Sequence, residues 1–171
     1  MAEIEAIETI YLEADVSSVT FSSIPATYEH LQLRTSIRSA YAAADYAMLY
    51  IRLNGDTGAN YTRHYMYGHD SSTGGGGDTS QTFMLLGITE PNATEPSAVY
   101  ANHVIDLLDY ANTNKNTTAS AINGQLGWPV AQQLSGLWDD TSAVSTILLY
   151  DGNAQDFVRG SEFTLYGIQD S

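Results

Sequence analysis

The chain contains no cysteine, and it has only 6 lysines and arginines against 20 aspartates and glutamates, which gives a formal net charge of -14. Without cysteine, neither a disulfide nor a thiolate metal site can form. The excess of carboxylates repels phosphate backbones, so the composition argues against a nucleic-acid partner. We therefore expect a fold held together by packing and hydrogen bonds, with a well solvated acidic surface.

Long hydrophobic runs are missing as well, although 43% of the 171 residues are hydrophobic. No segment approaches the roughly 20 consecutive apolar residues that cross a bilayer, so we expect no membrane span. The first residues, Met1-Ala-Glu-Ile-Glu5, are acidic where a secretory signal is basic and then apolar, and we expect no export signal. The length fits one domain covering residues 1–171.

No stretch has the period of a long amphipathic helix, whereas alternation of apolar and polar residues recurs along the whole chain. In residues 29–38, for example, Leu31, Leu33 and Ile37 point one way while Gln32 and Arg34 point the other. We count roughly nine or ten such strands at a spacing of about 8 to 15 residues. This cadence predicts an all-β protein, a single-domain antiparallel β-sandwich that is jelly-roll-like.

The last part of the chain shows the clearest strand pattern. Residues 138–150 and 157–168 are predicted to be two strands joined by a polar turn at 151–156, whose Asp, Gly and Asn residues suit tight turns. In the second strand Phe163 and Leu165 share one face. We expect this strand pair to close a sheet.

Three further segments carry local predictions. Residues 46–53 and 60–67 are predicted to form a hairpin across the turn sequence Asn54-Gly-Asp-Thr-Gly58. Residues 68–78 contain four consecutive glycines and are expected to be an exposed, flexible loop. Residues 127–133 are expected to be irregular.

Tyrosine and arginine gather on what we expect to be the face turned away from the core in the predicted hairpin. Tyr and Arg are favoured in protein interfaces because they combine contact area with directional hydrogen bonds. The same face could instead pack inside the sandwich, and sugar stacking would use the same residue types. The interface candidates are Tyr46, Tyr50, Arg52, Tyr61, Arg63, Tyr65 and Tyr67.

Metal and cofactor sites are not predicted. The four histidines, His30, His64, His69 and His103, show no zinc-ligand spacing and are expected to be structural or surface residues. Acidic residues in Gly- and Asn-rich loops could offer oxygen ligands to calcium, but turn formation explains the same residues and no EF-hand pattern occurs. These loop residues are Asp56, Asp151 and Asp156.

Catalytic motifs are also not found. The glycines at 74–77 are not followed by the Lys-Ser/Thr of a phosphate-binding loop, and no Gly-x-Ser-x-Gly elbow occurs. Carboxylates are so numerous that a glycosidase pair could be drawn anywhere, which gives such a pair no weight. The sequence therefore predicts a protein that is not an enzyme.

Several fragments together resemble a group of tailed-phage virion structural proteins. They are Val19–Tyr28, Leu31–Arg34 with Ser39 beyond it, Arg52–Tyr61, Trp138–Ser142 and the C-terminal pattern Gly160-Ser-x-Phe-x-Leu-Tyr-Gly-Ile168. The similarity keeps the same order over nearly the whole chain. Its most specific part is the C-terminal pattern, because it combines several uncommon choices.

This resemblance implies structural work on a virion, at the capsid or tail surface, without catalytic residues. The expected function is that of a capsid decoration or cement protein, which binds the major capsid protein or other virion subunits and associates with itself, with a trimer favoured. The alternative is a tail- or fibre-associated module that binds a host surface glycan or another receptor. Neither role implies a nucleic acid, a membrane or a cofactor as a partner.

Overall fold

The computed structural model describes residues 3–43, 46–90, 98–125 and 129–169. These residues form strands and no helix, so none of them belongs to a helix that could cross a membrane. The strands are β1 (Glu3–Tyr11), β2 (Ser18–Phe21), β3 (His30–Ile37), β4 (Ala47–Leu53), β5 (Tyr61–His69), β6 (Ser72–Gln81), β7 (Met84–Glu90), β8 (Ala101–Leu108), β9 (Thr117–Gln125), β10 (Val130–Trp138), β11 (Ile147–Asp151) and β12 (Glu162–Gln169). The predicted all-β class is confirmed.

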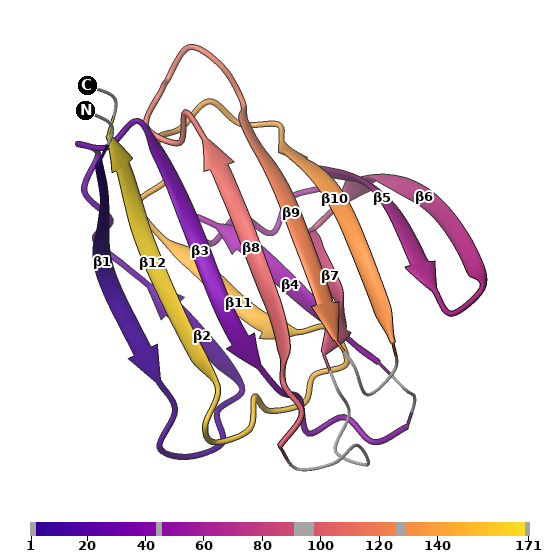
Figure 1. The fold of residues 1–171 in the computed structure, drawn as a ribbon. Coiled ribbons are helices and arrows are strands. Elements are labelled where there is room, and N and C mark those ends of the chain that lie inside the picture. Colours follow the sequence, from indigo (N-terminus) through magenta and orange to yellow (C-terminus); the bar gives the residue numbers. More distant parts are fainter. Residues whose placement is uncertain (1–2, 44–45, 91–97, 126–128, 170–171) are drawn as a thin grey trace.

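Two antiparallel sheets face each other (Figure 1). The larger sheet has the order β1-β12-β3-β8-β9-β10-β5-β6, and the smaller one has the order β2-β11-β4-β7. The chain begins and ends at one edge of the larger sheet, where Glu3 of β1 pairs with Gln169 of β12. The antiparallel β-sandwich predicted from the sequence is thus present.

The core lies between the sheets and is built from the alternating residues of both inner faces. In β4 every second residue from Ala47 to Leu53 is buried, and β8 shows the same alternation. Aromatic side chains fill the middle, and Phe157 and Phe163 meet edge to face with ring centroids 5.2 Å apart. Burying these rings supplies much of the hydrophobic stabilisation, since each aromatic side chain removes a large apolar area from water.

The predicted pairing of the last two strands is wrong, because β11 and β12 belong to different sheets. The polar segment after Asp151 does not close a hairpin but leads the chain from the smaller sheet to the larger one. Halfway along it, Phe157 is fully buried and bridges to Val16 and Ser39. β12 also does not close the sheet, since it lies between β1 and β3.

The predicted hairpin across Asn54–Gly58 is wrong for the same reason. β4 pairs with β11 and β7 in the smaller sheet, whereas β5 pairs with β10 and β6 in the larger one. Asn54 and Gly55 adopt positive φ angles of 51° and 68°, as the turn chemistry suggested. The same turn residues, however, serve a connection between two sheets as well as a hairpin.

The glycine-rich segment is not a loop. Residues 72–81 form β6, which pairs with β5 in a register that places Tyr67 opposite Gly74 and Tyr65 opposite Gly76. The segment predicted to be irregular also contains a strand, because β10 begins at Val130; residues 126–128 lie outside the described part of the chain. The larger sheet therefore contains two strands, β6 and β10, in segments where the sequence predicted a loop and irregular structure.

Candidate binding surface

The β5–β6 hairpin carries four of the seven interface candidates, and three of them, Arg63, Tyr65 and Tyr67, contact one another in a row. Arg63 forms an ion pair with Asp78 of β6, with 2.5 Å between Nη2 and Oδ2, and its guanidinium lies 5.0 Å from the ring centroid of Tyr65. The rings of Tyr65 and Tyr67 are stacked, with centroids 6.3 Å apart and planes inclined by 18°. An ion pair, a cation–π contact and a ring stack thus hold this row in one arrangement.

Glycine is required in β6 because the aromatic side chains of β5 lie across it. A Cβ atom at Gly74 would come within 2.6 Å of the Tyr67 hydroxyl, and one at Gly77 within 2.2 Å of the His64 ring. A Cβ at Gly75 would meet the backbone oxygen of Tyr65 at 2.7 Å. The aromatic rings therefore supply the side-chain cover that the glycine strand lacks.

Tyr50 and Arg52 lie on the face of the smaller sheet that points away from the core. The Tyr50 ring stacks on Phe83 at 3.8 Å between centroids with planes 9° apart. Arg52 lies 5.0 Å from the ring centroid of Tyr150 and donates a hydrogen bond from Nε to the carbonyl of Thr82 at 3.0 Å. These contacts fasten the connection between β6 and β7 onto the outside of the smaller sheet.

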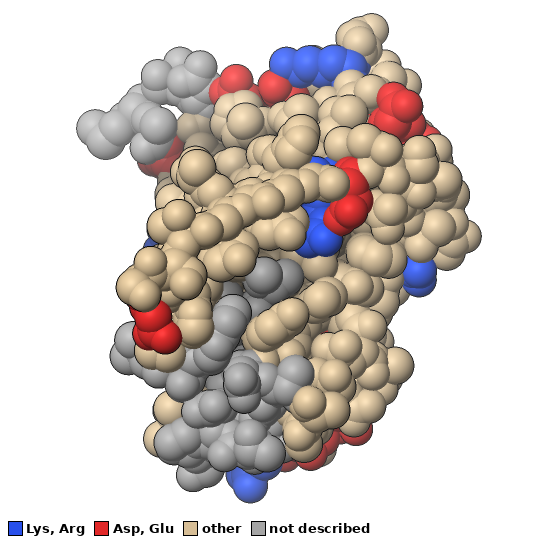
Figure 2. Space-filling view, turned by 90° about the vertical axis from the view of Figure 1, so that its right-hand side faces the viewer, with Lys and Arg blue, Asp and Glu red and all other residues tan. Residues whose placement is uncertain are grey.

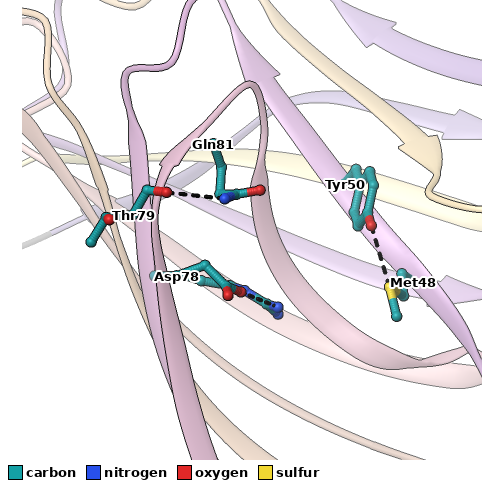
Figure 3. A network of polar contacts seen from close by, with 6 residues as sticks. Met48, Tyr50, Asp78, Thr79 and Gln81 are labelled. Atoms are coloured by element: carbon teal, nitrogen blue, oxygen red, sulfur yellow. Dashed lines mark hydrogen bonds and ion pairs between the residues drawn. The ribbon is translucent and has the colours of Figure 1, made fainter.

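The contact between Tyr50 and Met48 on β4 and the contacts of Asp78 and Gln81 on β6 lie within one close view (Figure 3). Burial raises the pKa of Tyr50; the positive charge of Arg63 opposes this shift, and the carboxylates of Asp151 and Asp78 add to it. The Tyr50 hydroxyl donates to Sδ of Met48 at 3.3 Å. Tyrosines and arginines from β4 and β5 therefore gather in one region although these strands do not pair.

Tyr61 and Tyr46 do not belong to this region in the way the sequence suggested. Tyr61 is fully buried, its hydroxyl accepts the backbone N–H of Leu53 at 3.1 Å, and burial raises its pKa to about 12. It is a core residue and not a surface one. Tyr46 is half-buried and precedes β4 instead of lying in the strand.

The outer face of the larger sheet is a surface that the sequence reasoning missed. On β9, β10 and β5 the residues that point away from the smaller sheet include no Asp, Glu, Lys or Arg. Ile122 and Met66 are 64% and 60% exposed there. They lie in one row across the sheet, because Ile122 pairs with Gln133 and Gln133 pairs with Met66.

We call this surface the uncharged face; it consists of Thr118, Ser120, Ile122, Gly124, Ala131, Gln133, Ser135, Leu137, Thr62, His64, Met66 and Gly68. Seen from the β5–β6 side, most of the described surface is uncharged; a basic and an acidic residue adjoin near the middle of the view, and the other charged residues lie toward its outline (Figure 2). The sequence does contain a signal for this face, namely the alternation of buried and outward-pointing residues in 130–138. These residues form β10, which lies between β9 and β5.

No family model and no curated protein matches the chain.

Two of the three acidic residues considered for calcium, Asp56 and Asp151, have carboxylates engaged in internal hydrogen bonds, whereas Asp156 accepts a hydrogen bond from Ala40 through its backbone oxygen. The Asp56 carboxylate accepts hydrogen bonds from Trp138 Nε1 at 2.7 Å and Asn60 Nδ2 at 2.9 Å, and the bond from Trp138 is the main reason that its pKa is lowered. Asp151 is buried and accepts a hydrogen bond from the Ser39 hydroxyl at 2.6 Å. Both carboxylates also accept a backbone N–H two residues further along the chain, from Gly58 and from Asn153, as turn-forming aspartates do.

One other group has the composition of a metal site, namely Glu29, His30 and Asp109, whose ligand atoms lie within 4.8 Å of one another. His30 Nδ1, however, accepts the backbone N–H of Asp109 at 3.0 Å, so in the neutral ring the proton sits on Nε2. The carboxylate of Asp109 forms an ion pair with Lys115 at 2.5 Å. The ring therefore offers no free lone pair, and these contacts account for the group without an ion.

Proposed function

We propose that this chain is a non-enzymatic structural protein of a tailed-phage virion, acting as a capsid decoration or cement subunit through contacts with neighbouring subunits. The observation that carries the proposal is the uncharged face, which occupies part of a chain whose formal net charge is -14. Interface cores are depleted in charged residues and enriched in aromatic side chains, methionine and arginine. The resemblance of the C-terminal pattern to virion proteins points in the same direction.

The strand order supports a jelly-roll scaffold with additions. Eight strands form two layers, β1-β12-β3-β8 and β2-β11-β4-β7, in which the chain crosses repeatedly from one layer to the other, as two interleaved Greek keys require. The remaining strands are two inserted hairpins, β5–β6 and β9–β10, which extend the first layer beyond β8. The uncharged face lies on three of these four added strands, so the candidate surface is an elaboration of the scaffold.

The uncharged face is large enough to form the central part of a protein contact. Three strands about 4.8 Å apart and nine residues long, at about 3.3 Å per residue, cover about 14 by 30 Å. This area is about half of the roughly 800 Å² that each partner contributes to an interface of standard size. Because this face carries no formal charge, covering it desolvates no ion, and the acidic remainder of the surface stays in water.

The proposal is tested with capsids of the parent phage from which the protein is absent. We expect purified protein to bind them saturably and to raise their resistance to heat. The double variant Met66→Glu/Ile122→Glu places two charges on the uncharged face and is expected to lose binding by at least about tenfold, since each buried unpaired charge is costly. Thr113→Glu/Asn114→Glu, in the exposed β8–β9 loop, adds the same charge and serves as control.

Two results would end the cement role: wild-type protein that does not bind such capsids, or the same loss of binding in the control as in the face variant. Circular dichroism and thermal unfolding establish beforehand that both variants fold, so that a binding defect is not an unfolding defect.

A glycan- or receptor-binding role at the tail is the second candidate. It is favoured by a shallow hollow whose lining includes Tyr67 and its cross-strand neighbour Gln132, since an aromatic ring beside an amide group is suited to sugars. A glycan array separates the two roles. Selective binding that is lost in Tyr67→Ala would support this candidate, whereas a cement protein shows no selective signal.

A further inference from the structure

The larger sheet ends in a long strand that has few of the features that usually protect an edge. β6 is ten residues long and contains no lysine, arginine, glutamate or proline. Among the described residues its backbone is paired only with β5 (Figure 1). Its outward N–H and C=O groups therefore form a row that a further strand can pair with.

The other three edges are protected in recognisable ways. β1 carries Glu3, Glu5 and Glu8 and has a register shift between Ala6 and Glu8. β2 is only four residues long, and the pairing of β7 with β4 is interrupted at two places. Charges, bulges and shortness all discourage the addition of a strand. β6 has one register shift too, but it lies at the C-terminal end of the strand, between Asp78 and Gln81. Among the described edges, β6 is therefore the long one whose middle part, the run of four glycines, carries no charge and no register shift.

We infer that β6 pairs antiparallel with β6 of a second copy of this chain, which joins the two larger sheets into one across a two-fold axis. The surroundings of β6 favour this partner over an ordinary extended peptide. The rings of Tyr67 and Tyr65 lie over the glycines on one face, and His64 lies over Gly77 on the other. A neighbouring strand with bulky side chains would compete with these rings for space, whereas a glycine strand leaves the space free.

Charge favours the same arrangement. Asp78 is the single ionisable residue of β6, and it is already paired with Arg63. The two-fold axis can pass through the middle of the glycine run at either Gly75 or Gly76. Asp78 then lies opposite Ser72 or Gly74 of the other copy, respectively, and not opposite the Asp78 of that copy. Two molecules that each carry a net charge of -14 can therefore approach at this edge without placing carboxylates side by side.

A two-fold pair differs from the trimer that the resemblance favoured. An antiparallel pairing of one strand with its own copy is isologous, so it uses both edges completely and closes at two subunits. The pairing also places the uncharged faces of both copies on the same side of the joined sheet, because a two-fold axis perpendicular to the sheet keeps each face on its side. The dimer would thus offer twice the surface to a particle.

The inference is tested on the isolated chain, which separates it from the particle role. Sedimentation equilibrium of the wild-type protein is expected to show a monomer–dimer equilibrium. The variant Thr73→Lys/Thr79→Lys places like charges directly opposite each other across the axis when Asp78 faces Gly74, and two residues apart along the pair when Asp78 faces Ser72. In either register it is expected to raise the dissociation constant roughly tenfold or more. Thr113→Lys/Asn114→Lys, in the β8–β9 loop, adds the same charge away from the edge and is expected to leave the constant within about threefold of wild type.

Hydrogen exchange gives a readout that needs no variant. Amides of residues 73–79 are expected to become more protected as protein concentration rises, because their outward N–H groups pair only in the dimer. A monomer at all concentrations with unchanged exchange in β6 would overturn the inference. So would a dimer that dissociates in Ile122→Glu but not in the double lysine variant, since that result would place the contact on the uncharged face.

Discussion

Acid should destabilise this protein through one buried histidine. His103 is 1% exposed, its Nδ1 lies 2.9 Å from the Thr35 hydroxyl, and its Nε2 has no hydrogen-bond partner among the described residues. Gly87 packs so closely over the ring that a Cβ atom there would lie 2.3 Å from Nε2. Burial lowers the pKa of His103 from 6.5 to about 3, because the charged ring would lose its hydration without gaining a counter-ion.

The sign and size of the effect follow from proton linkage. Between pH 6.5 and about 3 the unfolded chain binds a proton at His103 that the folded chain does not, so stability falls as the pH falls through this window. The slope approaches about 1.4 kcal/mol per pH unit, and the loss at pH 5 is about 2 kcal/mol relative to neutral pH. Asp56, whose pKa is lowered, loses its contribution only below 3.8, so the range from pH 6 to pH 4.5 reports on His103.

Urea denaturation at pH 7.5, 6 and 5 measures this loss directly. Wild-type protein is expected to lose about 2 kcal/mol of unfolding free energy over this range, whereas His103→Gln loses less than about 0.5 kcal/mol, because glutamine does not titrate. His64→Gln, at an exposed position, is the matched control and should follow wild type. Equal pH slopes in wild type and His103→Gln would refute the reasoning.

Two further predictions concern packing and turn structure. Gly75→Ala is expected to destabilise the protein by about 1–3 kcal/mol, because the new Cβ meets the Tyr65 backbone oxygen at 2.7 Å. Gly68→Ala is the control and should cost less, because a Cβ there has nothing within 4 Å. Equal losses of stability in thermal unfolding of the two variants would contradict this account. Trp138→Phe removes the 2.7 Å hydrogen bond to Asp56 and is expected to lower the free energy of unfolding by about 2 kcal/mol. The carboxyl pKa of Asp56, measured by NMR titration, is expected to rise in this variant. An unchanged pKa would contradict the conclusion that Trp138 is the main cause of the lowered value.

The faces of individual strands were predictable because alternation is a local signal. Leu31, Leu33 and Ile37 of β3 are buried as predicted, and so are Phe163 and Leu165 of β12. Strand partners were not predictable, because pairing joins residues far apart in the sequence. The turn after Leu53 has the residues of a hairpin, yet it sends the chain to the other sheet.

The glycine strand could not be recognised because glycine has no side chain with which to show alternation. The relevant pattern lies in its neighbour, where Tyr65 and Tyr67 recur at period two and cover Gly76 and Gly74. The sequence therefore pointed to the aromatic half of the hairpin and missed the half that completes it.

The candidate surface was predictable to a similar extent. Arg63, Tyr65 and Tyr67 do form a row, whereas the burial of Tyr61 depends on how far the smaller sheet extends over β5, which no local pattern reveals. The uncharged face was missed because residues 130–133 belong to a strand that was expected to be irregular. A surface of this kind is defined by what several strands lack, and it becomes visible only when their order is known.

A cryo-EM map of the parent virion tests the proposed role most directly. We expect density for the two-layer sandwich on the capsid surface, with the uncharged face and the β5–β6 hairpin against neighbouring subunits and the acidic surface toward solvent. A map in which the sandwich is absent from the particle, or in which Met66 and Ile122 face solvent while another surface makes the contacts, would contradict the account.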